Sequence, residues 1–343
     1  MEDIALNWIG FPNESLVVNG LAWFNETTPR LWRLPERLKS VVRPPLWELA
    51  LQPSGGRIRF STEATALAIR LHYPSLAGMV DMHKIGQFGL DLYVDNEYCS
   101  TVYPVDQPDV EASFFADAPA LLRNVCIYLP LYAPVEVKAI GLSDGAQLWP
   151  PGPFAVPRPV VYYGSSITQG ACASRSGMSY QAILSRDLLL DYVNLGFNGN
   201  GKGDREIAAA MAEIDAACYV LDFAQNCDSP AQLRKVYGPF IDTLREAHAR
   251  TPILCITPIF ASAEGYSKEA DLRYSEMRKA IRDAVSERTR RGDQRLHAID
   301  GTRLLGCEDS DGLTDGLHPN DLGFQRMAER LSVAILEALK ASL

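Results

Sequence analysis

The sequence predicts an α/β protein with a doubly wound, five-stranded parallel sheet that follows an antiparallel β-sandwich. Three observations support this fold class: apolar residues alternate in the first part of the chain, short apolar runs alternate with amphipathic segments in the second part, and prolines crowd the stretch between them. At 343 residues the chain exceeds the size at which one hydrophobic core stops growing. We therefore expect an N-terminal domain over residues 1–150 and a C-terminal domain over residues 151–343.

The boundary is placed at a proline-rich stretch. Trp149–Pro159 contains five prolines in eleven residues, which excludes a helix or a central strand and indicates a stiff linker.

Upstream of this linker, apolar residues recur at every second position, as in strands that present one face to a core. The alternating runs are Leu67–Tyr73, Phe88–Val94, Val125–Leu131 and Val135–Val137. Gly55-Gly56 and Asp95-Asn96 supply turns, and little helical periodicity competes. An antiparallel sandwich is expected.

Downstream of the linker, strand and helix signals alternate. The expected strands are Val160–Tyr163, Tyr192–Phe197, Cys218–Phe223, Ile253–Thr257 and Leu296–Ile299. The expected helices are Met178–Leu190, Arg205–Ile214, Ala231–Ala249, Glu269–Arg290 and Asp321–Lys340. This alternation predicts a parallel sheet covered on both sides, and five strands suit the order 2-1-3-4-5.

Composition excludes several classes of protein. The net charge is −9, from 33 basic and 42 acidic residues, and without a basic cluster nucleic acid is not an expected partner. No apolar run approaches the roughly 18 residues of a membrane span, and no secretory signal opens the sequence, so a cytoplasmic location is expected, although a removed signal would leave the same picture. The seven cysteines are scattered and lack C-x-x-C spacing, so neither a disulfide framework nor a zinc site is expected.

The active site of an open parallel sheet lies beyond the carboxyl ends of its strands. The loop after the first strand, Gly164–Gly170, presents serine there; the loop after the second, Asn194–Gly201, has glycines whose N–H groups could face a ligand; the loop after the third offers the side-chain amide of Asn226. Taken singly, each feature is more simply explained as a cap or a turn.

The sharpest local signal is a carboxylate three residues before an imidazole, at Asp315 and His318, in the turn before the last helix. In a turn, this spacing lets the aspartate accept from one ring nitrogen and leaves the other nitrogen free as a base. The alternative is that both residues merely cap the helix. The remaining histidines lack such a neighbour and are interpreted as structural: His72, His83, His248 and His297.

Together the four loops supply a complete chemical set. A serine hydroxyl needs a positioned base near pH 7, and the developing oxyanion needs about two or three fixed donors. All of these groups are expected at one edge of the sheet.

These residues resemble the SGNH/GDSL hydrolase family, in which a block like Gly164–Gly170 carries the nucleophile, here Ser166. The resemblance implies that Ser166 N–H, Gly199 N–H and the Asn226 amide form an oxyanion hole, and that Asp315 and His318 belong to a D-x-x-H-P element with His318 as base. The sequence departs from the family pattern at two positions that do no covalent chemistry: Ser165 stands for the usual Asp, and Ala224 for the usual Gly.

A second resemblance covers the N-terminal half. Gly89–Tyr93 matches the G-x-D-L-Y element of a β-rich domain that precedes a subset of bacterial SGNH hydrolases. The layout is similar to carbohydrate esterases that join a jelly-roll domain to a flavodoxin-like SGNH domain. It implies a small-molecule or carbohydrate ester as substrate, with a short acyl group on a sugar or glycoside.

The expected reaction is a two-step acyl transfer through Ser166 that requires no metal or organic cofactor. An acyltransferase would use the same residues, and a carbohydrate-binding protein with an inactive hydrolase domain is the alternative from another class. Arg175 and the Ile259–Ser267 loop are candidate walls of the substrate pocket. The sequence leaves acyl length, alcohol and oligomeric state open, a homo-oligomer included.

Overall fold

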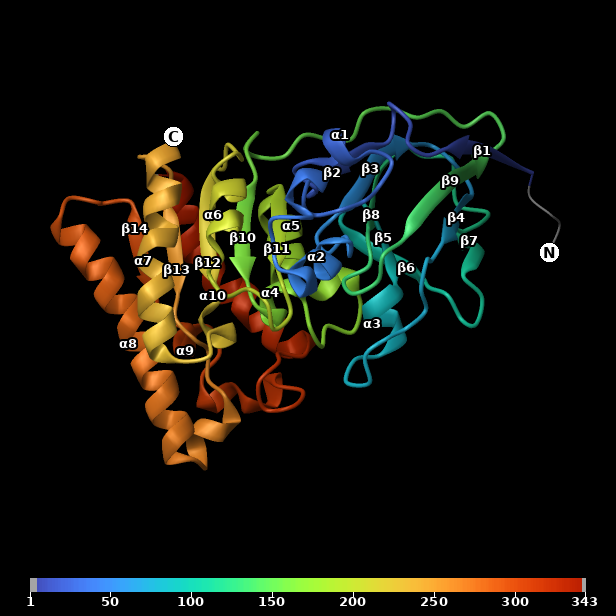
Figure 1. Cartoon of the computed structure of the whole chain (residues 1–343). Helices are drawn as coiled ribbons and strands as arrows, with labels where there is room; N and C mark the ends of the chain where they lie inside the picture. The colour runs from blue at the N-terminus through green and yellow to red at the C-terminus, as the bar shows by residue number, and fades with distance from the viewer. Residues whose placement is uncertain (1–4, 341–343) are drawn as a thin grey trace. The chain divides into compact units, whose positions relative to one another are not determined.

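The computed structural model describes residues 5–340, and the chain divides into two compact units. The first unit holds the chain up to Glu36, residues Glu48–Phe154 and the short segment Ser174–Gly177. The second unit holds Arg37–Trp47, Ala155–Ala173 and the chain from Met178 onward. Two short segments thus belong to a different unit from their neighbours in the sequence. Figure 1 traces the elements of both units along the chain.

The first unit contains two antiparallel sheets, as predicted. The four-stranded sheet has the order β1 (Leu6–Gly10), β9 (Glu136–Ser143), β4 (Leu67–His72) and β7 (Asp109–Phe115). The five-stranded sheet has the order β2 (Val17–Asn19), β3 (Arg57–Thr62), β8 (Arg123–Tyr128), β5 (Leu90–Val94) and β6 (Glu97–Val102). All neighbouring strands pair antiparallel.

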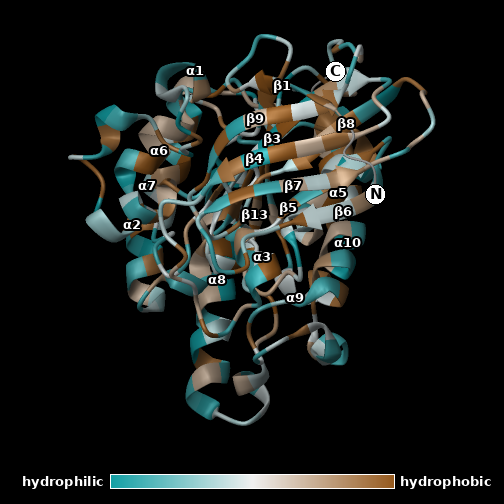
Figure 2. Ribbon diagram, turned by 90° about the vertical axis from the view of Figure 1, so that its right-hand side faces the viewer, coloured by the Kyte–Doolittle hydropathy of each residue, from teal (hydrophilic) through white to brown (hydrophobic). Residues whose placement is uncertain are grey.

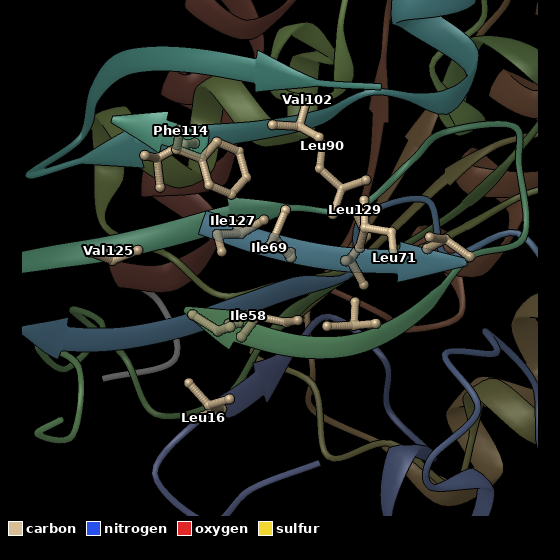
Figure 3. Close-up of a cluster of buried hydrophobic side chains, with 14 of the residues drawn as sticks. Leu16, Ile58, Ile69, Leu71, Leu90, Val102, Phe114, Val125, Ile127 and Leu129 are labelled. Atoms are coloured by element: carbon tan, nitrogen blue, oxygen red, sulfur yellow. The ribbon is translucent and has the colours of Figure 1, made fainter. Parts of the chain in front are cut away.

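The alternating apolar residues form the core between these sheets (Figure 3). Ile69 and Leu71 of β4 are buried, whereas Arg70 between them is exposed, which is the period of two expected of a strand with one face in a core. Leu92 of β5 and Ile127 of β8 are buried in the same cluster. Asp95 and Asn96 both have positive φ, so the β5–β6 hairpin turns where the sequence predicted a turn.

The alternating pattern predicted one strand that is too long, and it did not predict several short helices. Phe88 ends helix α3 (Lys84–Phe88), and the strand begins only at Leu90, although Phe88 still packs into the core. Helices α1 (Phe24–Thr27) and α2 (Pro44–Ala50) were also missed. Helices of four to seven residues span at most two turns, which is too short for a periodic signal.

The second unit contains the predicted parallel sheet. Its order is β11 (Tyr192–Gly196), β10 (Val160–Gly164), β12 (Cys218–Asp222), β13 (Ile253–Ile256) and β14 (Leu296–Ile299), which is 2-1-3-4-5 in chain order. All four neighbouring pairs are parallel. Four of these strands, β10, β11, β12 and β13, are buried along their whole length, as expected of a sheet covered on both faces.

Helices pack in two sets beside this sheet (Figure 1). One set is α6 (Arg205–Met211), α7 (Pro230–Ala247) and α8 (Lys268–Arg290); the other contains α5 (Tyr180–Leu188), α9 (Gly301–Leu304) and α10 (Asp321–Lys340). Hydrophobic and hydrophilic residues alternate along α7 and α10, so each helix presents an apolar stripe (Figure 2). In residues 5–340, no helix has the length and apolar character needed to cross a bilayer.

The proline-rich stretch contains no helix, and its first half lies along the sandwich. The backbone of Trp149 pairs with Ser61, and Arg59 stacks on the ring of Phe154 with its guanidinium carbon 3.9 Å from the ring centroid. Residues up to Phe154 belong to the first unit and residues from Ala155 to the second.

Candidate active site

Three strand ends meet at one point of the parallel sheet. Gly164 at the end of β10 is the register partner of both Gly196 on β11 and Asp222 on β12. A Cβ on Gly164 would lie 1.9 Å from the Thr168 hydroxyl, and one on Gly196 would lie 2.2 Å from the backbone nitrogen of Gln169. Glycine is required at both positions because the helix after β10 packs directly against the strand ends.

That helix, α4 (Ser166–Gln169), carries Ser166 at its first position. Ser165 has an extended backbone, and its hydroxyl accepts from Ile167 N–H, so it caps the helix. Gly170 ends the helix with φ +107°. Ser165 therefore has the helix-cap role that the sequence analysis considered for this turn. Ser166 is the first residue of the helix and does not cap it.

Ser166 meets His318. The hydroxyl Oγ of Ser166 lies 2.9 Å from Nε2 of His318, although 152 residues separate them in the chain. Only 6% of Ser166 is exposed, while the imidazole side chain is 17% exposed. The two groups are within proton-sharing distance at the carboxyl edge of the sheet.

Asp315 holds the other side of the imidazole. Its Oδ2 lies 2.7 Å from His318 Nδ1, and its Oδ1 accepts the backbone N–H groups of Leu317 and His318 at 3.0 and 2.8 Å. Burial opposes ionisation of this carboxyl, but these hydrogen bonds from His318 and Leu317 outweigh it and hold the pKa of Asp315 below its usual range. A carboxylate here fixes Nδ1 as the protonated nitrogen and leaves Nε2 to accept the serine proton.

Two of the three candidate oxyanion donors, Gly199 and Asn226, lie in the loops after β11 and β12, whereas the third, the Ser166 N–H, belongs to α4. Gly199 has φ +64° and nothing within 4 Å of the place where a Cβ would be, so its surroundings are open. Asn226 ends the 3₁₀ helix η3 (Ala224–Asn226), and its Nδ2 donates to Phe197 O at 3.0 Å. An amide nitrogen has two hydrogens, so this bond uses one of them and ties the Asn226 loop to the Gly199 loop.

Residues 157–336 match the family model described as the GDSL-like Lipase/Acylhydrolase family. The chain belongs to this family. It is an esterase of the SGNH type, and residues 6–148 match a second model, GxDLY, described as the N-terminus of Esterase_SGNH_hydro-type. Comparison with curated proteins gives no match.

Solved structures resemble the chain over nearly its whole length. A structure described as that of a GDSL-like lipase from Bacteroides ovatus is 30% identical, with 98% of each chain covered and a TM-score of 0.89. The salicylyl-acyltransferase SsfX3 from a tetracycline biosynthetic pathway is 22% identical, with 97% of this chain and 98% of that chain covered and a TM-score of 0.82. A family two carbohydrate esterase from Clostridium thermocellum is 16% identical, with 84% and 94% covered and a TM-score of 0.62. The last two likenesses concern the fold.

The structure of this SGNH esterase adds a buried carboxyl that the sequence analysis missed. Asp222 is 0% exposed at the end of β12, and its Oδ2 lies 3.3 Å from the hydroxyl of Thr168 in α4. Burial raises the pKa of Asp222 to about 7, although hydrogen bonds from Gln225 and Thr168 oppose the shift. The sequence did contain a signal for this residue, because Asp222 is a charged residue at the end of an otherwise apolar strand.

Further hydrogen bonds hold α4 in place. Thr168 O accepts from the side-chain amides of Asn194 and Gln181, both at 2.7 Å, and Gln169 Oε1 accepts Asn198 N–H at 2.9 Å. All of these side chains except that of Asn198 are fully buried. They connect the Ser166 helix to the Gly199 loop.

Arg175, a candidate substrate residue, belongs to the first unit, and the structure gives it partners there. Its Nη1 donates to Asp91 Oδ2 at 3.1 Å and to the Tyr93 hydroxyl at 2.5 Å, and its guanidinium carbon lies 3.9 Å from the centroid of the Tyr98 ring. Gly177 N–H also donates to Asp91, at 2.7 Å. Asp91 and Tyr93 are the Asp and Tyr of the G-x-D-L-Y element, so this element binds the segment Ser174–Gly177.

The Ile259–Ser267 loop, the second candidate wall, contacts the Asp315 turn. Ser262 N–H donates to Gly316 O at 2.7 Å. Arg278 of α8 supports the loop by an ion pair with Glu264 and by bonds to the carbonyls of Pro258 and Ile259. The loop is thus held next to the residues that carry His318.

His72, which the sequence analysis gave no carboxylate neighbour, has one in the structure. His72 Nδ1 lies 2.8 Å from Asp109 Oδ1 across the β4–β7 pair. The sequence analysis missed this pair because a cross-strand neighbour 37 residues away leaves no local spacing signal.

Proposed function

We propose that this esterase hydrolyses short acyl esters through a covalent acyl-enzyme on Ser166. The observation that carries the proposal is the 2.9 Å approach of Ser166 Oγ to His318 Nε2, with Asp315 bound to the opposite ring nitrogen. This is the arrangement that activates a serine hydroxyl near neutral pH.

The first half of the reaction forms the acyl-enzyme. His318 Nε2 takes the Ser166 proton as Oγ attacks the ester carbonyl, and the carbonyl oxygen becomes an oxyanion. The N–H groups of Ser166 and Gly199 and the Asn226 amide would stabilise it. Collapse of this intermediate breaks the bond to the alcohol oxygen, which leaves with the proton from His318.

The second half releases the acid. His318 takes a proton from water, the water oxygen attacks the acyl carbonyl, and the bond to Ser166 Oγ breaks as the serine recovers its proton. Asp315 stays ionised and stabilises the charged imidazole in both halves. Residues of this chain perform every proton transfer.

For the alcohol we propose a sugar or glycoside, and for the acyl group acetyl or another short chain. The fold likeness to family two carbohydrate esterases, over both parts of the chain, supports this choice. The fold likeness to a salicylyl-acyltransferase over 97% of this chain supports a second candidate, transfer of the acyl group to an alcohol in place of water.

The test is a panel of esters, from acetyl to long-chain and from aryl to sugar alcohols, run with the wild type, Ser166→Ala and His318→Ala. We expect both variants to lose several orders of magnitude in kcat and to remain folded by circular dichroism. His72→Ala is the matched control, because His72 also has a carboxylate 2.8 Å from Nδ1 but lies in the β-sandwich. Turnover by Ser166→Ala close to that of the wild type would refute the nucleophile.

Product analysis separates the two candidates. With a sugar acceptor added, hydrolysis yields free acid whatever the acceptor concentration, whereas an acyltransferase yields acylated acceptor at the expense of acid. A wild type that is inert towards the whole panel and towards a p-nitrophenyl phosphonate, yet binds glycans, would contradict both.

A further inference from the structure

A short segment of the N-terminal half belongs to the parallel-sheet unit. Arg37–Trp47 is part of the second unit, whereas the chain before it and residues 48–154 after it belong to the first. The segment makes two arginine–carboxylate pairs within the second unit, Arg37 with Glu213 and Arg43 with Asp204. The Arg43 pair lies at the loop that carries Gly199.

Arg43 makes four hydrogen bonds to this loop. Nε and Nη2 bind the two carboxylate oxygens of Asp204 at 2.7 and 3.1 Å. Nη1 donates to Asn200 Oδ1 at 2.8 Å, and Nη2 also donates to Asn200 O at 2.7 Å. The planar guanidinium therefore binds the carboxylate with two parallel bonds and Asn200 with two more, which fixes its orientation.

Asn200 passes this restraint to the Gly199 peptide. Its Nδ2 donates to the carbonyl oxygen of Asn198 at 2.9 Å. The amide orientation is chemically determined, because arginine only donates and a carbonyl only accepts, so Oδ1 must face Arg43 and Nδ2 must face Asn198.

The carbonyl of Asn198 and the N–H of Gly199 belong to one planar peptide. In a trans peptide these two groups point in opposite directions, so a bond that fixes the carbonyl also aims the N–H. On the preceding side, Asn198 N–H is held by Gln169 Oε1 at 2.9 Å. Gly199 itself has φ +64° and nothing within 4 Å of the place where a Cβ would be. Neither a side chain nor packing at Gly199 would therefore prevent this peptide from rotating.

We propose that Arg43 is a positioning residue for the oxyanion hole, acting through Asn200 to aim the Gly199 N–H. The inference rests on the proposed function, because it assigns Gly199 as an oxyanion donor. It gives the N-terminal half of the chain a part in catalysis that requires no contact with substrate.

The test measures kcat and KM for an aryl acetate and the second-order rate of inactivation by a p-nitrophenyl phosphonate, whose phosphoryl oxygen takes the oxyanion position. Removing an oxyanion donor outright costs about 10²–10³-fold in kcat, so misaiming one should cost about tenfold or more. We expect Arg43→Ala to lower kcat and the phosphonate rate together, with KM within about twofold of the wild type. Arg37→Ala, in the same segment, is the matched control.

Two further variants separate aiming from general support of the fold. Arg43→Lys keeps one charged donor and should recover part of the lost kcat. Asn200→Asp keeps an acceptor for Arg43 and turns that hydrogen bond into an ion pair, but it cannot donate to Asn198 O. It should therefore lose kcat as Arg43→Ala does while its melting temperature stays close to that of the wild type, because the ion pair with Arg43 offsets the lost bond.

The outcomes are distinguishable. An active, phosphonate-labelled wild type whose Arg43→Ala variant matches Arg37→Ala in kcat would overturn the positioning role and leave the proposed function intact. Full kcat in Asn200→Asp would overturn the relay through Asn200. A wild type with no ester turnover and no phosphonate labelling would refute the proposed function itself.

Discussion

Asp315 directs both carboxylate oxygens at His318: Oδ2 lies 2.7 Å from the ring Nδ1, and Oδ1 accepts the backbone N–H of the same residue at 2.8 Å. The side chain and the main chain of the histidine are therefore held by one group. The orientation of the imidazole depends on the charge and the acceptor capacity of that group.

Asp315→Asn should lower kcat by about 10²- to 10⁴-fold, because an amide can donate to Nδ1 and stabilise the wrong tautomer. The measurement is kcat for an aryl acetate near pH 7. Asp311→Asn is the control, since Asp311 is an exposed carboxylate four residues upstream. Equal rates in the two variants would contradict an orienting role.

The lowered pKa of Asp315 also predicts a pH dependence of stability. The carboxyl ionises more readily in the folded than in the unfolded chain, so its contribution to the free energy of unfolding is present above the unfolded value near 4. That contribution is lost as the pH falls through the lower folded value. The difference in free energy of unfolding between wild type and Asp315→Asn should therefore shrink below about pH 4, as measured by urea denaturation.

The contribution of Asp222 to the free energy of unfolding should change with pH in the opposite direction. Burial raises its pKa to about 7, so the folded chain holds a proton that the unfolded chain releases near 4. The wild type should lose stability relative to Asp222→Asn as the pH rises from about 4 to 7, and the difference should level off above that range. Denaturant titrations at pH 4, 6 and 8 test this, and a difference independent of pH would contradict the shift.

The contact between Asp222 and Thr168 gives that experiment a second comparison. Asp222→Asn keeps a polar group 3.3 Å from the Thr168 hydroxyl, whereas Asp222→Ala removes it and leaves a cavity beneath α4. We expect the Asn variant to keep most of its ester turnover and the Ala variant to be less stable by about 1–3 kcal/mol.

Gly196→Ala should displace the Ser166 helix. The added Cβ would lie 2.2 Å from Gln169 N and 2.6 Å from the carbonyl carbon of Thr168, and neither backbone atom can move without moving α4. We expect destabilisation by about 1–3 kcal/mol or more and a loss of kcat. Gly265→Ala is the control, because nothing lies within 4 Å of its Cβ position and its φ is not in the left-handed region. Wild-type kcat in Gly196→Ala would show that α4 tolerates the shift.

Arg175→Ala should destabilise the β-sandwich, because it leaves the fully buried Asp91 without its cation. The Arg175 side chain is 21% exposed and Asp91 keeps bonds from Thr101 and Gly177, so we expect a loss of about 1–3 kcal/mol, below that for a fully buried pair. Asp91→Asn combined with Arg175→Ala should recover part of that loss. If Arg175 instead binds substrate, Arg175→Ala will raise KM with little change in the free energy of unfolding.

The sequence predicted the parts of the fold that depend on local pattern. The Ser166–His318 pair could be anticipated because parallel strands bring their carboxyl ends, and the loops after them, to one edge of a sheet. The start of β5 was misplaced because Phe88 continues the strand's alternation although it ends a helix. Periodicity reports burial, and here burial continues across the change of structure.

Other features depend on contacts that leave no local trace. Arg43 reaches Asn200 across 157 positions, and Arg175 reaches Asp91 across 84. Neither arginine stands in a motif that points to its partner, so only the folded chain shows these pairs. Asp222 was accessible in principle, because it is the one charged residue of a strand that is buried throughout.

The interleaving of the chain between the two units limits how the protein can be divided. A polypeptide beginning at residue 151 would lack Arg37–Trp47, and its complement would retain Asp91 without Arg175 or the Gly177 N–H. The C-terminal fragment would then expose the surface that Arg37–Trp47 covers, and the N-terminal fragment would bury the Asp91 carboxyl without the two donors that bind it in the intact chain. A chimera of two relatives should therefore fold only when Arg37–Trp47 comes from the same relative as the second unit, and Ser174–Gly177 from the same relative as the first.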